Sequence, residues 1–326
     1  MKSVIVTLAK LLISGLFFFY VFSRVDLHRF VDTIRGVNFG LLACALPAIW
    51  FGHFICVLRW RILMRPLMPV PTLARLCCMY CIGLFFNLTF PTIIGGDAVK
   101  IYYAGKPSRS YTESFAAAFL DRDIGMFAMM TIACCAVLLH PASIPVVSIT
   151  LIVWSVFVVF FLCNVVVFTP RLHRTLDTVL KKLRYGKIAV KIDAVAKAFR
   201  VAGGQPVALC KSFGISFANQ LLGCAVVWLT ALSLDVHVSP FYFLIFVPVI
   251  TLISMIPISL NGMGLREYAF MSMFGAIGVA DESCIALGLL YSIMIILSSL
   301  PGGIVYIFFR GEVRDAQIAA AKTDFG

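Results

Sequence analysis

Long apolar runs dominate this sequence, and they limit strongly what the chain can fold into. A helix that crosses a membrane needs about 20 mostly apolar residues. Six stretches reach that length, at 4–23, 40–62, 112–139, 146–168, 212–234 and 284–309. Hydrophobic residues make up 61% of the chain and charged residues 13%, against about 45–50% and 25% in soluble domains. We therefore predict an all-α polytopic membrane protein, with a single integral membrane domain over residues 1–326.

Two further apolar stretches, 76–94 and 240–260, each end in a Pro/Gly break followed by charged residues. Lys and Arg are enriched in cytoplasmic loops, and the loop 171–211 carries ten of them. Four arginines favour the cytoplasmic side for the loop before 76–94 as well: Arg59, Arg61, Arg65 and Arg75. Both loops lie on the same side of the membrane only if 76–94 enters the membrane and returns.

The same reasoning makes 240–278 a second hairpin, entered from the opposite side of the membrane. We predict about six spanning helices plus two re-entrant helical hairpins, 76–106 and 240–278, arranged as an inverted repeat. Eight spanning helices are the alternative, because both leftover stretches are long enough to cross. Transporters built from inverted repeats bind substrate where the Gly- or Pro-interrupted segments of the two halves meet.

Residues 170–211 are expected to form a cytoplasmic, basic, amphipathic connector between the halves. Apolar residues recur at helical spacing among its lysines, as in helices that lie on anionic membrane surfaces. The charge of this connector either recruits lipid or only fixes the topology. The net charge of +12 lies beside apolar spans, so it indicates topology and anionic lipids, not nucleic acid. We expect a protein of a bacterial or archaeal cytoplasmic membrane, with both termini cytoplasmic.

The first break contains residue types that suit an anion. Asp97 stands where a helix N-cap would, and Lys100 follows one turn later. The free N–H groups and the helix dipole at such a start favour an anion such as a lipid phosphate. The alternative is that Lys100 only extends to the headgroup region of the bilayer. The candidate residues of this break are Asn87, Pro91, Gly95, Gly96, Asp97 and Lys100.

The second break repeats the pattern of a cap-like start followed by a cation. Asn261, Gly262 and Gly264 precede Arg266 and Glu267. Irregular backbone inside a membrane must be surrounded by protein or line a water-filled cavity, so both breaks are expected to line one. Extension of Arg266 to the headgroup region is again the alternative.

The third candidate site is the segment DRDIG, inside the predicted span 112–139. Arg122 is costly in a membrane interior and must find partners there. Asp121 and Asp123 lie about 200° apart around the helix, on opposite sides of Arg122. Arg122 either contacts the substrate or forms a structural ion pair with one of these two acids.

Three motifs together resemble a known family. They are NLTFPTIIGGDAVKIYYAG, DRDIG and PISLNGMGLRE, in that order. The chain resembles the lysylphosphatidylglycerol synthase transmembrane family, also called flippase-like integral membrane proteins. Its members include the N-terminal part of the bacterial multiple peptide resistance factor, held to flip a lipid made by a soluble aminoacyl-transferase domain. The sequence here shows no such domain, so the resemblance implies lipid translocation without synthesis. It also implies site roles for Gly95, Gly96, Asp97, Lys100, Arg122, Gly262, Gly264, Arg266 and Glu267.

These observations favour a transporter or binding protein for a membrane phospholipid or glycolipid, most readily one with an anionic headgroup. A membrane-embedded transferase with Asp97 or Asp123 as its base is the first alternative. The second is a non-catalytic partner of a lipid-synthesis enzyme. Cys78 and Cys81 form a lone C-x-x-C on an apolar segment, which we interpret as packing residues, with a redox or metal site as the alternative. The histidines show no metal-ligand spacing, so no metal or cofactor is expected. The sequence allows a homo-oligomer.

Overall fold

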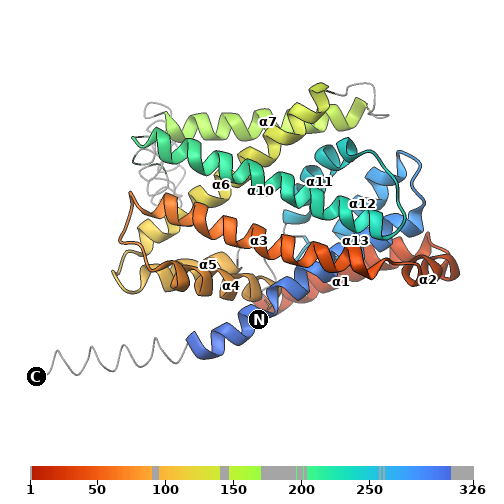
Figure 1. The fold of residues 1–326 in the computed structure, drawn as a ribbon, viewed down its shortest axis with the longest axis horizontal. Coiled ribbons are helices and arrows are strands. Elements are labelled where there is room, and N and C mark those ends of the chain that lie inside the picture. Colours follow the sequence, from red (N-terminus) through yellow and green to blue (C-terminus); the bar gives the residue numbers. More distant parts are fainter. Residues whose placement is uncertain are drawn as a thin grey trace, which may run out of the picture.

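The structure, a computed structural model, describes residues 2–89, 95–139, 147–169, 196, 201, 204–256, 258–259 and 261–309. Its described part is helical, without strands. Most of the helices lie side by side along a common direction (Figure 1). The predicted connector 170–211 lies almost wholly outside the described residues, and α10 begins before it ends.

Long helices form where the six apolar stretches predict them. They are α1 (Lys2–Ser23), α3 (Phe39–Met64), α6 (Tyr111–Leu139), α7 (Val147–Phe168), α10 (Pro206–Ser233) and α13 (Asp281–Ser299). Among the described residues, four helices are long and apolar enough to cross a membrane: α3, α6, α10 and the stretch Asp281–Phe309. A fifth is added if α1 and α2 (Leu27–Arg35), which meet at a 93° bend, count as one span. The predicted all-α membrane protein is confirmed, and the number of spans stays a prediction.

Four shorter helices occupy the two predicted hairpins. They are α4 (Leu73–Thr89), α5 (Gly95–Gly105), α11 (Pro240–Met255) and α12 (Leu265–Gly275). α4 packs against α5, and α11 packs against α12. α5 and α12 have 11 residues each, so each is about 17 Å long, roughly half the hydrocarbon thickness of a bilayer.

Helix starts follow from local chemistry. The Asp26 carboxylate accepts hydrogen bonds from the backbone N–H groups of His28 (2.8 Å) and Arg29 (3.4 Å) at the start of α2. The Asn38 side chain accepts from Gly40 and Leu41 in the same way at the start of α3. These acceptors satisfy N–H groups that have no partner inside the helix. The amphipathic helix α2 is an element that the sequence analysis did not predict.

The two halves of the chain pack in matching ways. The helix pairs in contact include two sets: α3–α4, α3–α6, α5–α6 and α4–α13, and α10–α11, α10–α13, α12–α13 and α6–α11. The pairs α4–α13 and α6–α11 join the two halves. Exchanging α3 with α10, α4 with α11, α5 with α12 and α6 with α13 converts each pair of the first set into one of the second. α3 and α10 lie side by side and antiparallel (Figure 1). The start of α3 meets the end of α10, where the backbone N–H of Asn38 donates to the carbonyl of Ser233 at 2.8 Å.

Glycine brings the first hairpin helices into close contact. A Cβ atom added to Gly96 would lie 1.9 Å from the carbonyl oxygen of Gly83, far inside van der Waals distance. Likewise, a Cβ atom on Gly302 would lie 2.0 Å from the carbonyl oxygen of Cys81. α4 therefore packs backbone to backbone against α5 on one side and against the helical residues 301–309 on the other.

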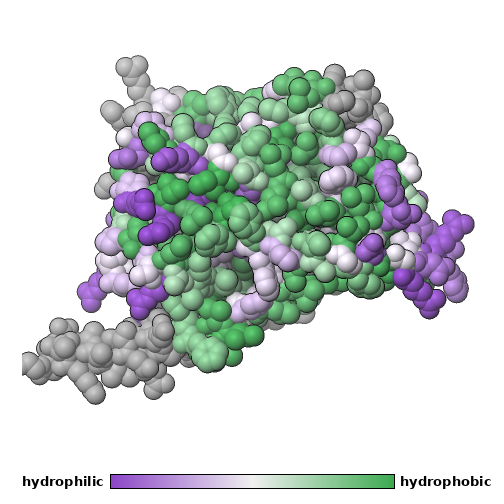
Figure 2. Space-filling view, in the orientation of Figure 1, coloured by the Kyte–Doolittle hydropathy of each residue, from purple (hydrophilic) through white to green (hydrophobic). Residues whose placement is uncertain are grey.

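The surface and the interior both fit a membrane protein. Figure 2 shows an apolar band across the visible face, with hydrophilic residues gathered at the two opposite ends of the helices. The largest buried cluster includes four aromatic side chains of α11 and α12, Phe243, Phe246, Phe270 and Phe274. Exposed apolar residues in such a band are expected where lipid, not water, surrounds the chain.

Candidate functional site

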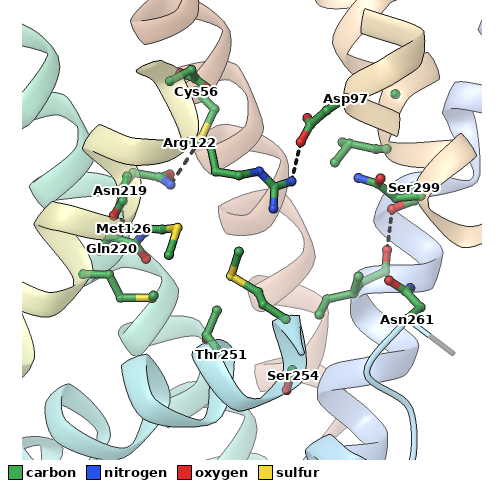
Figure 3. A pocket seen from close by; sticks show the side chains of 18 of the residues that line it. Cys56, Asp97, Arg122, Met126, Asn219, Gln220, Thr251, Ser254, Asn261 and Ser299 are labelled. Atoms are coloured by element: carbon green, nitrogen blue, oxygen red, sulfur yellow. Dashed lines mark hydrogen bonds and ion pairs between the residues drawn. The ribbon is translucent and has the colours of Figure 1, made fainter. Parts of the chain in front are cut away.

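A cavity of about 380 Å³ lies between the two halves. Its lining comes from α3, α4, α5, α6, α10, α11, α12 and α13 and the segment before α12. All three segments singled out in the sequence reach it: the first break through Asp97 and Lys100, DRDIG through Asp121 and Arg122, and the second break through Asn261 and Arg266. In Figure 3 the Arg122 side chain extends across this cavity toward Asp97.

Asp97 is the centre of a charged cluster. The Lys100 ammonium lies 2.7 Å from one carboxylate oxygen of Asp97, and the Arg122 guanidinium donates to the other. The Lys100 nitrogen also lies 4.7 Å from the ring centroid of Tyr80 and 5.7 Å from that of Trp60, which adds cation–π attraction. Only 11% of the Lys100 side chain is exposed, so it does not extend to the headgroup region as the alternative required.

The first break differs in detail from its prediction. α5 begins at Gly95, so Asp97 lies within the first helical turn instead of at the cap. The backbone N–H of Gly96 donates to the side-chain oxygen of Asn87 at 2.8 Å. Asn87 thus satisfies one N–H of the helix start, which leaves the Asp97 carboxylate to bind the two cations. Pro91 lies outside the described residues.

The second break holds a buried arginine. Arg266 is 9% exposed and donates to the Ser292 hydroxyl at 3.0 Å and to the backbone carbonyl of Asn261 at 3.3 Å. Its guanidinium carbon lies 5.8 Å from the ring centroid of Tyr291. The Ser292 hydroxyl in turn donates to the carboxylate of Glu267 at 2.7 Å. Arg266 is therefore fixed at the cavity wall instead of extending along the surface.

The backbone before α12 depends on residues that adopt positive φ. Asn261, Gly262 and Gly264 have φ values of 51°, 77° and 79°, a region that glycine and asparagine enter most readily. The carboxylate of Glu267 accepts the Gly264 N–H at 2.6 Å. Glu267 is 0% exposed and lies outside the cavity lining, so it stabilises the helix start and orients Ser292.

Arg59 was assigned in the sequence analysis to a cytoplasmic loop, and that assignment is wrong. The residue lies inside α3 and is 6% exposed. It donates to the Asp121 carboxylate at 2.6 Å and to the Ser216 hydroxyl at 2.8 Å. The Asp121 carboxylate neutralises the arginine and offsets part of the hydration that Arg59 loses inside the protein.

The alternative of an ion pair between Arg122 and a neighbouring acid of its own helix is also corrected. Asp121 pairs with Arg59, and Asp97 pairs with Arg122. Asp123 lines a second cavity, of about 490 Å³, between α6, α7 and α10. Residues 121 and 123 do point to different sides of the helix, as their angular spacing predicted. Asp123 is therefore not part of the central cavity.

The charges around the central cavity leave a positive surplus. Among the described residues, four cations line it: Arg59, Lys100, Arg122 and Arg266. Asp97 and Asp121 also line it, and Glu267 reaches Arg266 through Ser292. Four cations against three carboxylates leave one net positive charge when all are ionised. That surplus lies at the Asp97 cluster, where two cations share one carboxylate.

Several cavity residues were not predicted from the sequence. Asn219 and Gln220 of α10 line the cavity, and so do Tyr80 and Tyr291. Polar amides inside the apolar stretch 212–234 were a usable signal, because such groups are costly in lipid without a partner. Among the described residues, no group of three or more His, Cys, Asp or Glu is placed to hold a metal ion.

A comparison with protein-family models gives an independent result. Residues 7–302 match the model of the lysylphosphatidylglycerol synthase TM region. The chain belongs to this family. The resemblance carried by the three motifs is thus confirmed, and this family membership indicates an integral membrane protein with a role related to membrane lipids. Searches of curated proteins and of solved structures found no match to the chain.

Within this lysylphosphatidylglycerol synthase TM family member, the three motifs meet at one place. Residues that are far apart in the chain, such as Asp97 and Arg266, line one cavity. The arrangement can offer several charge-assisted hydrogen bonds to one anion, and such bonds are stronger than neutral ones.

Proposed function

We propose that this protein binds the phosphate of a lipid headgroup in the central cavity and moves that lipid between the two leaflets. The observation that carries the proposal is the surplus positive charge in a cavity built by both halves. A single phosphodiester anion would neutralise it. An anion that leaves water loses its hydration, and the cations at Lys100 and Arg122 would offset that loss.

In this proposal the Asp97 carboxylate binds the two cations when no headgroup phosphate is present. These are the same two cations, Lys100 and Arg122, that a phosphate would meet. A bound phosphate would share these donors with Asp97 and bring the cluster to neutrality. When the phosphate leaves, Asp97 again contacts both cations, so neither of them loses every anionic partner although the cluster keeps one net positive charge.

The proposal includes the re-entrant hairpins and the inverted repeat. Support comes from the short lengths of α5 and α12, from the matching contacts of the two halves and from the antiparallel α3 and α10. Two halves of opposite orientation around one site allow the site to open to either leaflet in turn. The lipid tails would stay in the bilayer while the headgroup passes through the cavity.

The membrane orientation is proposed from the charges at the two ends of the molecule. The loop between α3 and α4 and the one between α5 and α6 carry Arg65, Lys106 and Arg109 without an acid. The loops before α11 and at the start of α13 carry Asp235, Asp281 and Glu282 without Lys or Arg. The positive-inside rule puts the first end in the cytoplasm.

The purified full-length chain in liposomes tests this function. We expect fluorescently labelled phosphatidylglycerol to move between leaflets in proteoliposomes and not in protein-free liposomes. Lys100→Ala and Arg266→Ala should each weaken anionic-lipid binding by about 1.5–3 kcal/mol, the value of a charge-assisted hydrogen bond. Lys211→Ala, an exposed cation of α10 outside the cavity, is the matched control.

The outcomes of this experiment separate the proposal from its alternatives. Leaflet movement without a covalent product supports the transporter. A new covalent lipid in the presence of cell extract would instead indicate a transferase. Unchanged lipid binding in both cavity variants would contradict the headgroup site.

A further inference from the structure

A second cavity, of about 490 Å³, lies between α6, α7 and α10. In Figure 1 α7 lies along one edge of the molecule, and α6 packs against both α7 and α10. Among the described residues, none lines both this cavity and the central one. Its volume falls in the range of about 300–1,000 Å³ that is typical of ligand sites. The proposed headgroup path does not account for it.

Polar groups gather at one end of this cavity. Asp123 of α6 and Asn164 of α7 both line it, and their side chains form a hydrogen bond. The Asn164 nitrogen also donates to the backbone carbonyl of Phe160 at 3.1 Å. Because a carboxylate only accepts, the nitrogen supplies both bonds, and the Asn164 oxygen has no partner among the described residues. Thr169, just after α7, and Cys210, near the start of α10, complete this end.

Phenylalanine rings line the opposite end. Phe127 follows Asp123 by one turn of α6, and Phe161 precedes Asn164 by about one turn of α7. α6 and α7 run in opposite directions (Figure 1), so both rings lie on the same side of the polar pair, about 5 Å beyond it. The ring of Phe213 of α10 joins them, with its centroid 5.9 Å from that of Phe127. The cavity is therefore polar at one end and apolar at the other.

The Asp123 carboxylate has no basic partner among the described residues. The two acids of the central cavity, Asp97 and Asp121, each contact at least one cation. A charge inside an apolar region is costly without a partner. A ligand ammonium would supply that partner, because its three N–H donors can bond to the Asp123 carboxylate and to the Asn164 oxygen together.

We propose that this second cavity binds a cationic amphiphile with a single hydrocarbon chain, such as a long-chain primary amine. The ammonium binds the Asp123 carboxylate and the Asn164 oxygen. The chain lies along the rings of Phe127, Phe161 and Phe213. Charge complementarity favours a cation over an anion, and the apolar end favours a hydrocarbon chain. The inference does not rest on the proposed function, because this cavity shares no described residue with the central one.

Protection of Cys210 reports whether a probe enters the cavity. This thiol is exposed and lines the polar end, so a bound ligand should slow its reaction with N-ethylmaleimide. The protein is the full-length chain with its other cysteines replaced by alanine, in nanodiscs of phosphatidylcholine. Dodecylamine and dodecanol are the probes, since they share the chain and differ in the charge of the head. One charge-assisted hydrogen bond changes affinity by about 10- to 150-fold, so dodecylamine should protect Cys210 at a concentration in the bilayer that is lower by this factor.

Two variants tie the binding to the two ends of the cavity. Asp123→Asn removes the charge and keeps the shape of the side chain, so it should weaken dodecylamine about 10- to 150-fold, to the level of dodecanol, and leave dodecanol unchanged. Phe161→Ala removes apolar contact area and should weaken both probes to a similar extent. Leu162→Ala is the matched control, because Leu162 is 55% exposed on the same helix and lies outside the cavity lining; both probes should bind as in the parent protein.

Three results would overturn the inference. Equal protection by dodecylamine and dodecanol in the parent protein, or undiminished protection by dodecylamine in Asp123→Asn, would show that the carboxylate does not bind the ammonium. Equal weakening in Phe161→Ala and Leu162→Ala would show that the probes dissolve in the bilayer around the protein without entering the cavity. Melting temperatures equal to that of the parent protein exclude damage to the fold. The headgroup site is tested separately, by leaflet movement.

Discussion

Replacing Arg59 or Arg122 by methionine distinguishes an ion pair that only stabilises the fold from one whose arginine also binds the lipid headgroup. Both arginines contact a buried aspartate in the same cavity. Their surroundings differ: Asp121 has one basic partner, Arg59 at 2.6 Å, whereas Asp97 has a second cation at 2.7 Å in Lys100.

The difference in partners predicts the cost of each change. Arg59→Met leaves Asp121, which is 5% exposed, buried without a cation, and a stranded buried charge costs about 3–5 kcal/mol. Arg122→Met leaves Asp97 paired with Lys100, so no carboxylate is stranded, and the lost charge-assisted hydrogen bond to Asp97 is worth about 1.5–3 kcal/mol. Arg59→Met should thus lower the free energy of unfolding more than Arg122→Met does.

Removing the partner acid as well should restore stability where the pair has no third member. Replacing both members of a buried pair is often close to neutral, so Arg59→Met with Asp121→Asn should unfold near the parent value. Asp97→Asn would leave Lys100 buried without its carboxylate, so Arg122→Met is tested alone. The double variant is expected to move lipid, whereas Arg122→Met should not, because it lacks the arginine proposed to meet the phosphate.

Two measurements on the same proteins check this prediction. The free energy of unfolding comes from SDS titration in mixed micelles, and leaflet exchange comes from proteoliposomes with labelled phosphatidylglycerol. A folded Arg122→Met protein that transports at the parent rate would refute the role of Arg122 at the headgroup. A larger loss of stability in Arg122→Met than in Arg59→Met would show that the number of cations around the aspartate does not determine the loss in the free energy of unfolding.

Three further predictions follow from the packing, the second cavity and the charges at the two ends. Gly96→Ala puts a Cβ atom 1.9 Å from the carbonyl of α4, so the first hairpin should separate and stability should fall by about 1–3 kcal/mol or more, measured by SDS titration; an unchanged value would contradict the close contact. Asp123→Asn should leave anionic-lipid affinity unchanged, because Asp123 lines a different cavity; a weakened affinity would link the two cavities. On a cysteine-depleted background, His237→Cys should react with an impermeant maleimide added outside intact cells and Ser108→Cys should not; the opposite pattern would reverse the proposed orientation.

Much of the fold was predictable because the membrane restricts the possible structures. Backbone polar groups in lipid must be satisfied within the segment, so long apolar stretches become helices. The stretches 112–139 and 146–168 correspond closely to α6 (Tyr111–Leu139) and α7 (Val147–Phe168). The breaks at Gly95 and Gly264 were visible for a related reason, since glycine and charge inside an apolar run interrupt this rule.

The sequence by itself also indicated several of the charged residues that line the cavity, though not how they pair. Asp97, Lys100, Arg122 and Arg266 stood out because charges are rare and costly in apolar segments, and all four line the cavity. Arg59 was not predicted as a cavity residue, because its position near the end of an apolar stretch is equally typical of a cytoplasmic loop.

Only the tertiary structure decided the partners. Arg122 lies beside Asp121 and Asp123 in the chain, yet its guanidinium donates to Asp97, 25 positions away, and Asp121 pairs with Arg59 across 62 positions. Neighbours on a helix point in different directions by about 100° per residue, so nearness in sequence does not bring two side chains together. Helix packing brings them together, and here it depends on contacts such as Gly96 against Gly83. No local pattern of residues shows how such a contact positions side chains far away in the chain.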